Sequence, residues 1–292
     1  MKNLGDFLNL RESLVKFLHE DIGRGDVTSD CLIPPNTHSR AQIICKNNKP
    51  AVVCGLEEAR LVFDICGCST RTLVSDGLWV QNGTLVMTIE GETRSILKAE
   101  RTALNLIMRM SGIASETRLM RDTIEDLTDS VTIASTRKTA PGLRLLDKKA
   151  VTIGGGNSHR IRLDDMVLIK DNHLAITGSV TKSVEIAKQN AGSSLVIECE
   201  CKNFNQVIEA ITAGADIVML DNFSVAEAAK IMKEISTMGL RKKVKIEFSG
   251  GINIQNIRDY AKEGPDIISV GFITHSSKAI DFSLEIIESS RY

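Results

Sequence analysis

From residue 131 onward, short apolar runs alternate with stretches whose apolar residues recur at helical spacing. The runs predict strands at 131–134, 166–169, 195–197, 217–220, 244–246 and 267–270. The stretches between them predict helices at 180–189, 204–213, 225–236 and 254–263. N-cap residues and glycines suited to left-handed helix ends flank these helices, at Ser224, Asn253, Gly214, Gly239 and Gly264. Repeated strand–helix units with near-continuous apolar strands predict a parallel sheet covered by helices.

The strands of this sheet end in polar or glycine-rich segments. These segments are STRK (135–138), IKDN (169–172), ECE (198–200), LDN (220–222), EFSGG (247–251) and VG (270–271). In a TIM-like barrel the carboxyl ends of all strands converge on one face, where catalytic groups gather. In a doubly wound open sheet they spread along an edge, and only the switch point is used. Charges at the same place in six units favour the barrel, with the open sheet as the alternative, and they exceed what simple solvation of strand ends explains.

The first third of the chain has a mixed pattern that predicts a small α+β domain over residues 1–112. Helical patterns cover 1–21, 57–65 and 95–111, the last with Ser95 as a candidate N-cap. Short β-type runs cover 40–45 and 51–54, and two alternating strands flank Asn82-Gly83 within 78–89. An Asn-Gly pair between alternating strands predicts a hairpin.

Charge and composition exclude several classes of function. The formal net charge is −1, so the molecule as a whole has no field to attract nucleic acid or an anionic membrane. The sequence has no signal-peptide core and no apolar run of about 18 residues, so we expect a soluble, cytoplasmic protein. Cys66/Cys68 and Cys199/Cys201 could chelate metal, but no second pair stands at zinc-site spacing, and reduced, buried thiols are expected.

The barrel mouth predicted in this way contains charges of both signs. Its cations are Arg137, Lys138, His159, Arg160 and Lys170, and its acids are Glu198, Glu200, Asp221 and Glu247. Buried charges of one sign are costly unless a partner of the other sign arrives. The cations therefore indicate a substrate set with several negative charges, and the acids indicate hydroxyl groups or Mg²⁺ escorting a phosphate. The Ser249-Gly250-Gly251 segment and Gly271 stand after the last two strands, where barrels commonly bind phosphate.

Nine segments in order resemble one known family. They read EDIGRGDVT (20–28), ERTALN (100–105) with SGI (111–113), TRKT (136–139) with PGLR (141–144), GGG (154–156) with HR (159–160), LIKDNH (168–173), ECE (198–200), MLDN (219–222), SGGI (249–252), and SVG (269–271) with THS (274–276). Together these segments resemble the quinolinate phosphoribosyltransferases. The resemblance implies transfer of phosphoribosyl from phosphoribosyl pyrophosphate to quinolinate, with decarboxylation, to give nicotinate mononucleotide in NAD biosynthesis.

The resemblance also implies an architecture. It implies an N-terminal α/β sandwich over 1–112, an incomplete TIM-like α/β barrel over 113–276, and a C-terminal tail, 277–292, that packs back on the sandwich. It further implies Mg²⁺ as cofactor and a homodimer with a shared active site, with assembly beyond the dimer left open.

Carried over position by position, the resemblance implies a role for each site residue. Quinolinate would be bound by Arg137, His159, Arg160 and Lys170, with Arg101 of a partner subunit. Independently, Arg101 shares a helical stripe with Leu97, Leu104 and Met108, so we expect it on an apolar face. Phosphoribosyl pyrophosphate would be bound by Lys138, Glu200, Asp221, Ser249, Gly250, Gly271 and His275. Lys138, Lys170, Glu200 and Asp221 would act in catalysis, and Glu200 and Asp221 would hold Mg²⁺.

Some positions depart from the family pattern. Ser158 stands where Asn is usual and Arg162 where Gly is usual, and we expect Arg162 to point outward. Asp147-Lys148-Lys149 stands where Glu-Lys-Tyr is frequent. The alternative function is that of a diverged member, either a nicotinate-type phosphoribosyltransferase or a paralogue for molybdenum utilisation. Such a member would not need the carboxylate-binding cations that this chain retains.

Overall fold

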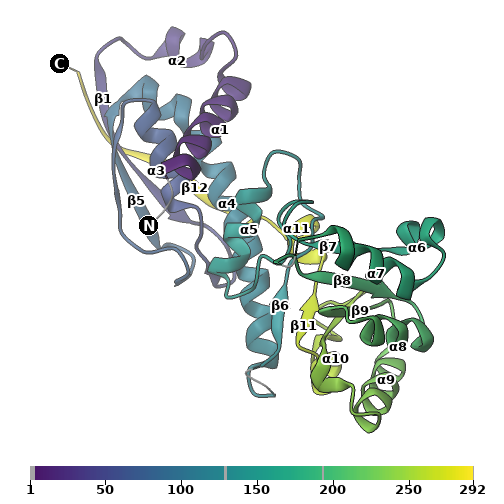
Figure 1. Ribbon diagram of the computed structural model, residues 1–292. Coiled ribbons are helices and arrows are strands. Elements are labelled where there is room, and N and C mark those ends of the chain that lie inside the picture. Colours follow the sequence, from purple (N-terminus) through teal and green to yellow (C-terminus); the bar gives the residue numbers. More distant parts are fainter. Residues whose placement is uncertain (1–3, 128–129, 193, 292) are drawn as a thin grey trace. The chain divides into compact units, whose positions relative to one another are not determined.

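The computed structural model describes residues 4–127, 130–192 and 194–291, and the chain forms two compact units (Figure 1). The first unit comprises Met1–Ser115 with Ser277–Tyr292, and the second comprises Glu116–Ser276. The division therefore falls three residues beyond the position expected from the sequence. The first three residues of the helix expected over 1–21 lie outside the described part of the chain.

The first unit is built on an antiparallel sheet with the strand order β12-β1-β5-β3. Its strands are β1 (Thr37–Cys45), β3 (Ser69–Thr72), β5 (Leu85–Glu92) and β12 (Phe282–Arg291). Along β1, buried positions alternate with more exposed ones, so one face of the sheet enters the core. The C-terminal residues belong to this unit because β12 pairs with β1 along its whole length.

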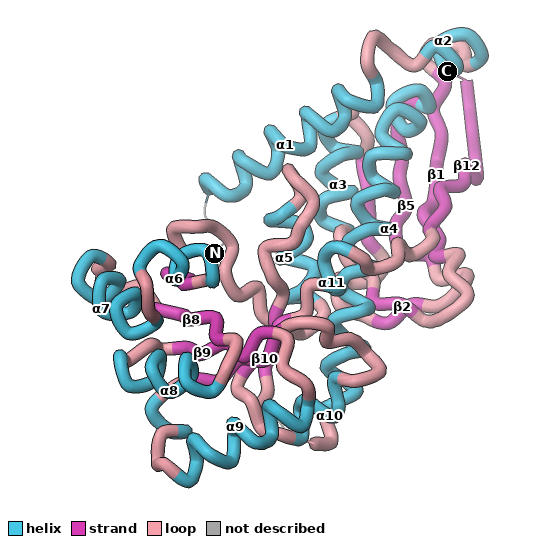
Figure 2. The backbone as a smooth tube through the Cα atoms, turned by 90° about the vertical axis from the view of Figure 1, so that its right-hand side faces the viewer, coloured by secondary structure: helices cyan, strands magenta, loops and turns pink. Residues whose placement is uncertain are grey.

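Helices α1 (Leu4–Ile22), α3 (Leu56–Ile65) and α4 (Thr93–Ile124) lie on one face of this sheet (Figure 2). The short helix α2 (Val27–Leu32) lies near one end of the sheet. The helix expected over 95–111 is wrong at both ends, since α4 begins earlier and continues to Ile124. Gly112 does not end it. A Cβ at Gly112 would lie 2.1 Å from the carbonyl oxygen of Lys278, so this glycine lets the returning tail approach the helix.

The hairpin expected over 78–89 is also wrong. Its first half is β4 (Trp79–Val80), which pairs with β2 (Ala51–Val52) in a separate two-stranded sheet. Its second half is β5, which pairs with β1 and β3. Gly83 does adopt a left-handed turn conformation at φ 85°, but the chains on its two sides enter different sheets.

The second unit is an incomplete α/β barrel, with six parallel strands in the order β6-β11-β10-β9-β8-β7. The strands are β6 (Thr132–Ala134), β7 (Val167–Ile169), β8 (Ile197–Cys201), β9 (Ile217–Asp221), β10 (Lys245–Ser249) and β11 (Ile267–Ser269). The helices are α5 (Arg144–Ile153), α6 (Asp171–Thr177), α7 (Val180–Asn190), α8 (Phe204–Ala213), α9 (Val225–Thr237), α10 (Ile257–Lys262) and α11 (Phe272–His275). Within the described residues β6 and β7 form opposite edges of the sheet, so the barrel stays open between them. The prediction of a barrel rather than an open doubly wound sheet is confirmed.

Local signals placed most helix ends correctly. Ser224 caps α9 with a reciprocal capping box to Glu227, and Gly214 ends α8 at φ 83°. Asn253 was expected to cap α10, but the cap is Asn256. The side chain of Asn253 instead accepts the backbone N–H of Gln255 at 2.9 Å, which forms a local turn before the helix. Across the described part of the chain, no helix combines the length and hydrophobicity needed to cross a membrane.

Candidate active site

A cavity of about 500 Å³ lies at the carboxyl ends of the barrel strands. All six strand ends contribute to it, because its lining includes Arg137 and Lys138 after β6, Lys170 after β7, Glu200 on β8, Asp221 on β9, Glu247 and Ser249 on β10, and Ser269 on β11. The loop between α5 and β7 adds His159 and Arg160. The structure therefore brings together, in one cavity, residues that are spread over more than a hundred positions of sequence.

A smaller cavity of about 280 Å³ shares part of this lining. Lys138, Ser249 and Gly250 line both cavities, and Gly271 and His275 line only the smaller one. Of the residues expected in the mouth, all but Glu198 line one of these two spaces. Glu198 is fully buried instead, with its Oε2 3.6 Å from His159 Nε2. Arg101 belongs to the first unit instead, on α4.

Arg101 is exposed in the single chain, contrary to the apolar position expected for it. Its stripe neighbour Leu104 is buried, and Leu97 and Met108 are half-buried. The guanidinium group extends past this stripe to solvent, as long cationic side chains do at the edge of an apolar face.

The two arginines of the cavity differ in how far their donors are already used. Arg160 is 9% exposed, and its Nε and Nη2 donate to the carbonyl oxygens of Arg162 and Leu163, both at 3.0 Å. Burial lowers the pKa of Arg160. Arg137 has a buried Nε without a hydrogen-bond partner among the described residues. A guanidinium group that lines a cavity and has a buried donor without a partner indicates an anionic ligand.

Arg162 points outward as expected. Its side chain is 69% exposed and its Nε lies 3.1 Å from Asp164 Oδ1. Only its backbone carbonyl serves the site, by accepting the hydrogen bond from Arg160. The departure from glycine at this position therefore adds no charge to the cavity.

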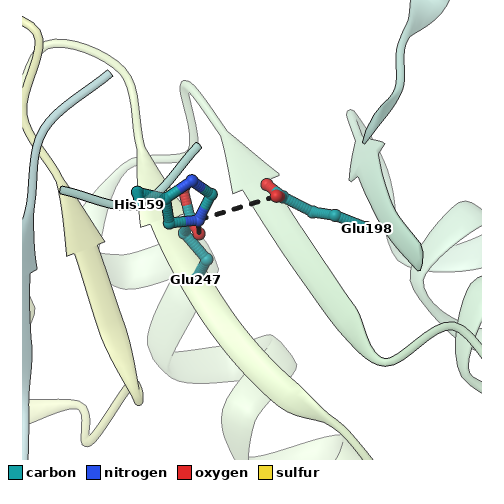
Figure 3. Close-up of side chains that lie close together, drawn as sticks. All are labelled: His159, Glu198 and Glu247. Carbon is teal, nitrogen blue, oxygen red and sulfur yellow. Dashed lines mark hydrogen bonds and ion pairs between the residues drawn. The ribbon is translucent and has the colours of Figure 1, made fainter. Parts of the chain in front are cut away.

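His159 meets two acids inside the barrel (Figure 3). Its Nε2 lies 2.9 Å from Glu247 Oε2 and 3.6 Å from Glu198 Oε2, and both carboxylates are fully buried. Ser269 Oγ donates to the other oxygen of Glu247. Burial, followed by the charge of Glu247, raises the pKa of Glu198 to about 8. Burial lowers the pKa of His159, but the hydrogen bond and charge of Glu247 and the charge of Glu198 together raise it.

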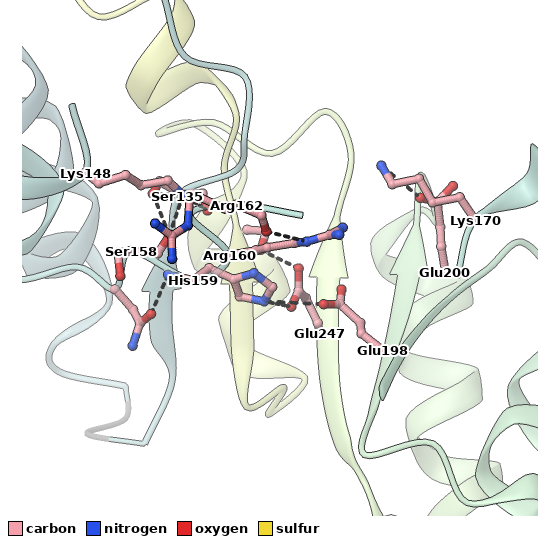
Figure 4. A network of polar contacts seen from close by, with 12 residues as sticks. Ser135, Lys148, Ser158, His159, Arg160, Arg162, Lys170, Glu198, Glu200 and Glu247 are labelled. Carbon is pink, nitrogen blue, oxygen red and sulfur yellow. Dashed lines mark hydrogen bonds and ion pairs between the residues drawn. The ribbon is translucent and has the colours of Figure 1, made fainter. Parts of the chain in front are cut away.

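Lys148 on α5 fixes the loop that carries His159 (Figure 4). Its Nζ donates to the carbonyl oxygen of Ser135 at 3.2 Å, to Ser135 Oγ at 3.0 Å, and to the carbonyl oxygen of Ser158. Burial is the main cause that lowers the pKa of Lys148 to about 8. Sequence reasoning noted Lys148 only as part of a departure from the family pattern and gave it no role. The available signal was its place in a helical segment beside apolar Leu146, Ala150 and Val151.

The acidic side of the cavity is formed by Glu200 and Asp221. Burial and then the charge of Asp221 raise the pKa of Glu200, so the two carboxylates repel each other across the cavity. Lys170 Nζ lies 3.8 Å from Glu200 Oε2, and Asn222 Nδ2 donates to Asp221 Oδ2 at 2.7 Å. Two neighbouring carboxylates with incomplete compensation suit a hard divalent cation or hydroxyl groups.

The comparisons with known proteins agree with one another. Residues 26–111 match the N-terminal domain of quinolinate phosphoribosyl transferase, and residues 113–285 match its C-terminal domain. A protein of Methanocaldococcus jannaschii named as a probable nicotinate-nucleotide pyrophosphorylase (carboxylating) is 42% identical over 94% of this chain and 96% of its own length. The protein with the same name in Methanothermobacter thermautotrophicus is 41% identical over 93% of this chain and 96% of its own. The solved structure of the nicotinate-nucleotide pyrophosphorylase of Francisella tularensis has a TM-score of 0.87 and 38% identity, with coverage of 95% of this chain and 96% of that one.

Proposed function

This chain belongs to the quinolinate phosphoribosyltransferase family, and we propose that its cavity joins quinolinate to phosphoribosyl pyrophosphate with release of carbon dioxide. The products are nicotinate mononucleotide and pyrophosphate, in NAD biosynthesis. The observation that carries the proposal is the collection of cations in one cavity, with a buried and unpaired Nε on Arg137. A monocarboxylate or an amide would not need so many positive charges.

Quinolinate carries two adjacent carboxylates, and we assign them to Arg137, His159, Arg160 and Lys170. Guanidinium groups bind carboxylates through paired N–H donors and stay charged at any physiological pH. Each such bond contributes about 1.5–3 kcal/mol net. Arg160 already donates two hydrogen bonds to backbone carbonyl oxygens, so it contributes mainly its positive charge to substrate binding. Arg137 has an unpaired Nε and therefore has more donors left for a carboxylate.

Phosphoribosyl pyrophosphate is assigned to the acidic side and to the smaller cavity. Ser249, Gly250, Gly271 and His275 receive the 5′-phosphate, and Lys138 approaches the pyrophosphate. Glu200 and Asp221 hold ribose hydroxyls or Mg²⁺. The paired carboxylates fit this ion, which when bound neutralises phosphate charge.

The reaction then follows from position and charge. As pyrophosphate leaves the ribose carbon, the sugar ring develops positive charge, which Glu200 and Asp221 favour electrostatically. Lys138 compensates the charge on the departing pyrophosphate. The pyridine nitrogen attacks the ribose carbon, and the positive charge on the resulting pyridinium stabilises the electron pair that stays on the ring carbon when the adjacent carboxylate departs as carbon dioxide. A proton from solvent then takes the place of the carboxylate on that carbon. Lys170, beside Glu200, keeps the substrate carboxylates in place during both stages.

We extend the proposal to assembly and location. The exposed Arg101 is supplied to the cavity of a second copy of this chain, so the enzyme is a homodimer with shared sites. The absence of a membrane-spanning helix from the described residues is compatible with a cytoplasmic enzyme.

The test supplies Mg²⁺ and phosphoribosyl pyrophosphate together with quinolinate, nicotinate or nicotinamide in turn. Carbon dioxide release and nicotinate mononucleotide formation are expected with quinolinate alone. Turnover of nicotinate at a comparable rate, without carbon dioxide, would instead identify a diverged nicotinate-type member.

A further inference from the structure

Glu247 is held in place by other residues of the protein on both sides of its carboxylate. It is fully buried on β10, and both of its carboxylate oxygens are engaged. Oε1 accepts a hydrogen bond from Ser269 Oγ on β11, and Oε2 lies 2.9 Å from His159 Nε2. Because both oxygens already have protein partners and the side chain is fully buried, Glu247 can act on the cavity through His159.

His159 is held so that its two ring nitrogens have different surroundings. Its backbone lies in the left-handed region at φ 49°, and its N–H donates to Asn157 Oδ1 at 2.6 Å. Nε2 faces the two carboxylates, and the other nitrogen, Nδ1, lies on the far side of the ring from them (Figure 3). Nδ1 has no hydrogen-bond partner within the described chain, and His159 lines the cavity. An unusual backbone conformation at a cavity residue indicates that the orientation of the ring matters.

The groups around the imidazole favour its charged form. Glu247 on β10 and Glu198 on β8 face Nε2, while the charge of Lys148 on α5 opposes their effect on the pKa of His159. Burial by itself lowers the pKa of His159, and the hydrogen bond to Glu247 is the largest of the influences that raise it. Glu247 is therefore the group that decides whether the buried ring keeps its second proton.

A metal ion is a poorer occupant of this cluster than a proton. The ligand atoms of His159, Glu198 and Glu247 do lie within 4.8 Å of one another. However, the 2.9 Å separation of Nε2 and Oε2 is that of a hydrogen bond, and Lys148 and Arg160 already place positive charge beside the cluster. A proton shared with His159 compensates Glu247 without adding a doubly charged ion next to two cations.

We propose that Glu247, anchored by Ser269, is a positioning residue that holds His159 as a cation and presents its Nδ1–H to a carboxylate of the diacid substrate. The inference rests on the proposed function and deepens it. It adds a positive charge to the quinolinate site, and this charge depends on a residue that acts through His159. The expected consequence is selectivity for a diacid that weakens as His159 loses its proton.

The first test measures the titration of His159 directly. The ring is followed by NMR in the ligand-free enzyme, with the signal assigned from a His159→Gln variant. In the wild type the midpoint should lie above the ordinary value of 6.5, and in Glu247→Gln below it, because burial then dominates. Glu185→Gln, at an exposed position on α7, is the control and should leave the midpoint unchanged. Equal midpoints in the wild type and Glu247→Gln would overturn the proposal.

The second test follows the consequence in catalysis. At pH 7.5, Glu247→Gln should raise KM for quinolinate by about ten- to a hundredfold, while KM for phosphoribosyl pyrophosphate changes by less than about threefold. Glu247→Asp should recover part of the loss because it restores the charge. With rising pH, affinity for quinolinate should fall at a lower pH in Glu247→Gln than in the wild type. An unchanged KM for quinolinate in a folded Glu247→Gln enzyme would contradict the proposal. A wild type that does not turn over quinolinate would instead contradict the proposed function, while the NMR midpoints still report on the Glu247–His159 pair.

Discussion

Asn222 stands so close to Gly250 that a Cβ added at Gly250 would lie 2.3 Å from Asn222 Oδ1. The two residues join the ends of neighbouring strands, since the Asn222 N–H donates to the carbonyl oxygen of Ser249 at 2.9 Å. Both have left-handed backbones, at φ 60° for Asn222 and 94° for Gly250. This contact fixes the loop that borders both cavities, next to Asp221 and Ser249, which are register partners at the ends of β9 and β10.

We predict that Gly250→Ala disrupts binding of phosphoribosyl pyrophosphate. The added methyl group must displace Asn222, which moves Asp221 and the phosphate loop together, so KM for this substrate should rise by about tenfold or more. Steady-state kinetics with each substrate varied in turn measure the effect. Gly251→Ala is the control, because Gly251 also has a positive φ, 64°, but a Cβ there meets no atom within 4 Å. Equal effects of the two substitutions would show that backbone strain, rather than the contact with Asn222, is responsible.

Lys148→Met should loosen the loop that carries His159. The substitution keeps most of the length of the side chain but leaves the buried carbonyl oxygen of Ser135 without its donor, at a cost of about 1–3 kcal/mol. The carbonyl oxygen of Ser158 keeps only the hydrogen bond from Ser135 Oγ at 3.4 Å. The value of kcat/KM for quinolinate should fall about tenfold or more. Thermal unfolding and steady-state kinetics on the same preparations separate the loss of stability from the loss of activity. Unchanged kinetics in the folded variant would show that the loop does not need this lysine.

The pH dependence of stability provides an independent check on Lys148. Its pKa is about 8 in the folded state and about 10.5 when the chain is unfolded. Between these values the unfolded chain binds more protons than the folded one, so this group makes the wild type more stable as pH rises from about 8 to 10.5. The free energy of unfolding of the wild type, relative to that of Lys148→Met, should therefore increase over this range. A constant or falling difference would mean that Lys148 is not destabilised in its charged form.

Much of the barrel could be predicted because its signals are local. The glycine after α8 and the Ser224 cap of α9 act within one helical turn, and the apolar runs of the strands are continuous. Polar residues at the strand ends also predicted the cavity, since parallel strands bring their carboxyl ends to one face. The true strand ends differ, however, because β8 and β10 continue through Glu198, Glu200 and Glu247. In the sequence an acidic residue suggests that a strand has ended. Here Glu198 and Glu247 are inside strands and lie next to His159 in the barrel.

What the sequence did not reveal depends on contacts between distant residues. The return of the tail beside Gly112 explains why α4 continues past a glycine, and no local pattern records that contact. The role of Lys148 was also missed, because its Nζ donates to the carbonyl oxygens of Ser135 and Ser158, which belong to separate loops. The pairing of β4 with β2 depends on a partner nearly thirty residues earlier, which a hairpin signal cannot detect. Long-range pairing and buried polar contacts are therefore the information that the structure adds.

Removal of Mg²⁺ should abolish turnover, and Glu200 and Asp221 should account for binding of the ion. Glu200→Gln and Asp221→Asn each remove one of two mutually repelling carboxylates, so affinity for a divalent cation should fall about tenfold or more. Electron paramagnetic resonance with Mn²⁺ in the presence of phosphoribosyl pyrophosphate measures binding, and Glu185→Gln is the control. Retention of Mn²⁺ affinity in both variants would place the ion elsewhere.

Arg101 should act across a subunit boundary. It is exposed on α4 in the single chain, whereas Arg137 lines the cavity of the barrel. Arg101→Ala and Arg137→Ala homodimers should each fold and each lose about ten- to a hundredfold or more of kcat/KM, because every site lacks one guanidinium. In a mixed dimer, one site receives both intact arginines and the other receives neither. Random exchange of subunits should therefore restore about a quarter of the wild-type sites. Activity is measured before and after the two variants are mixed. Mass spectrometry of differently tagged chains confirms that subunits have exchanged. Exchange without any recovery of activity is incompatible with a site shared between two chains.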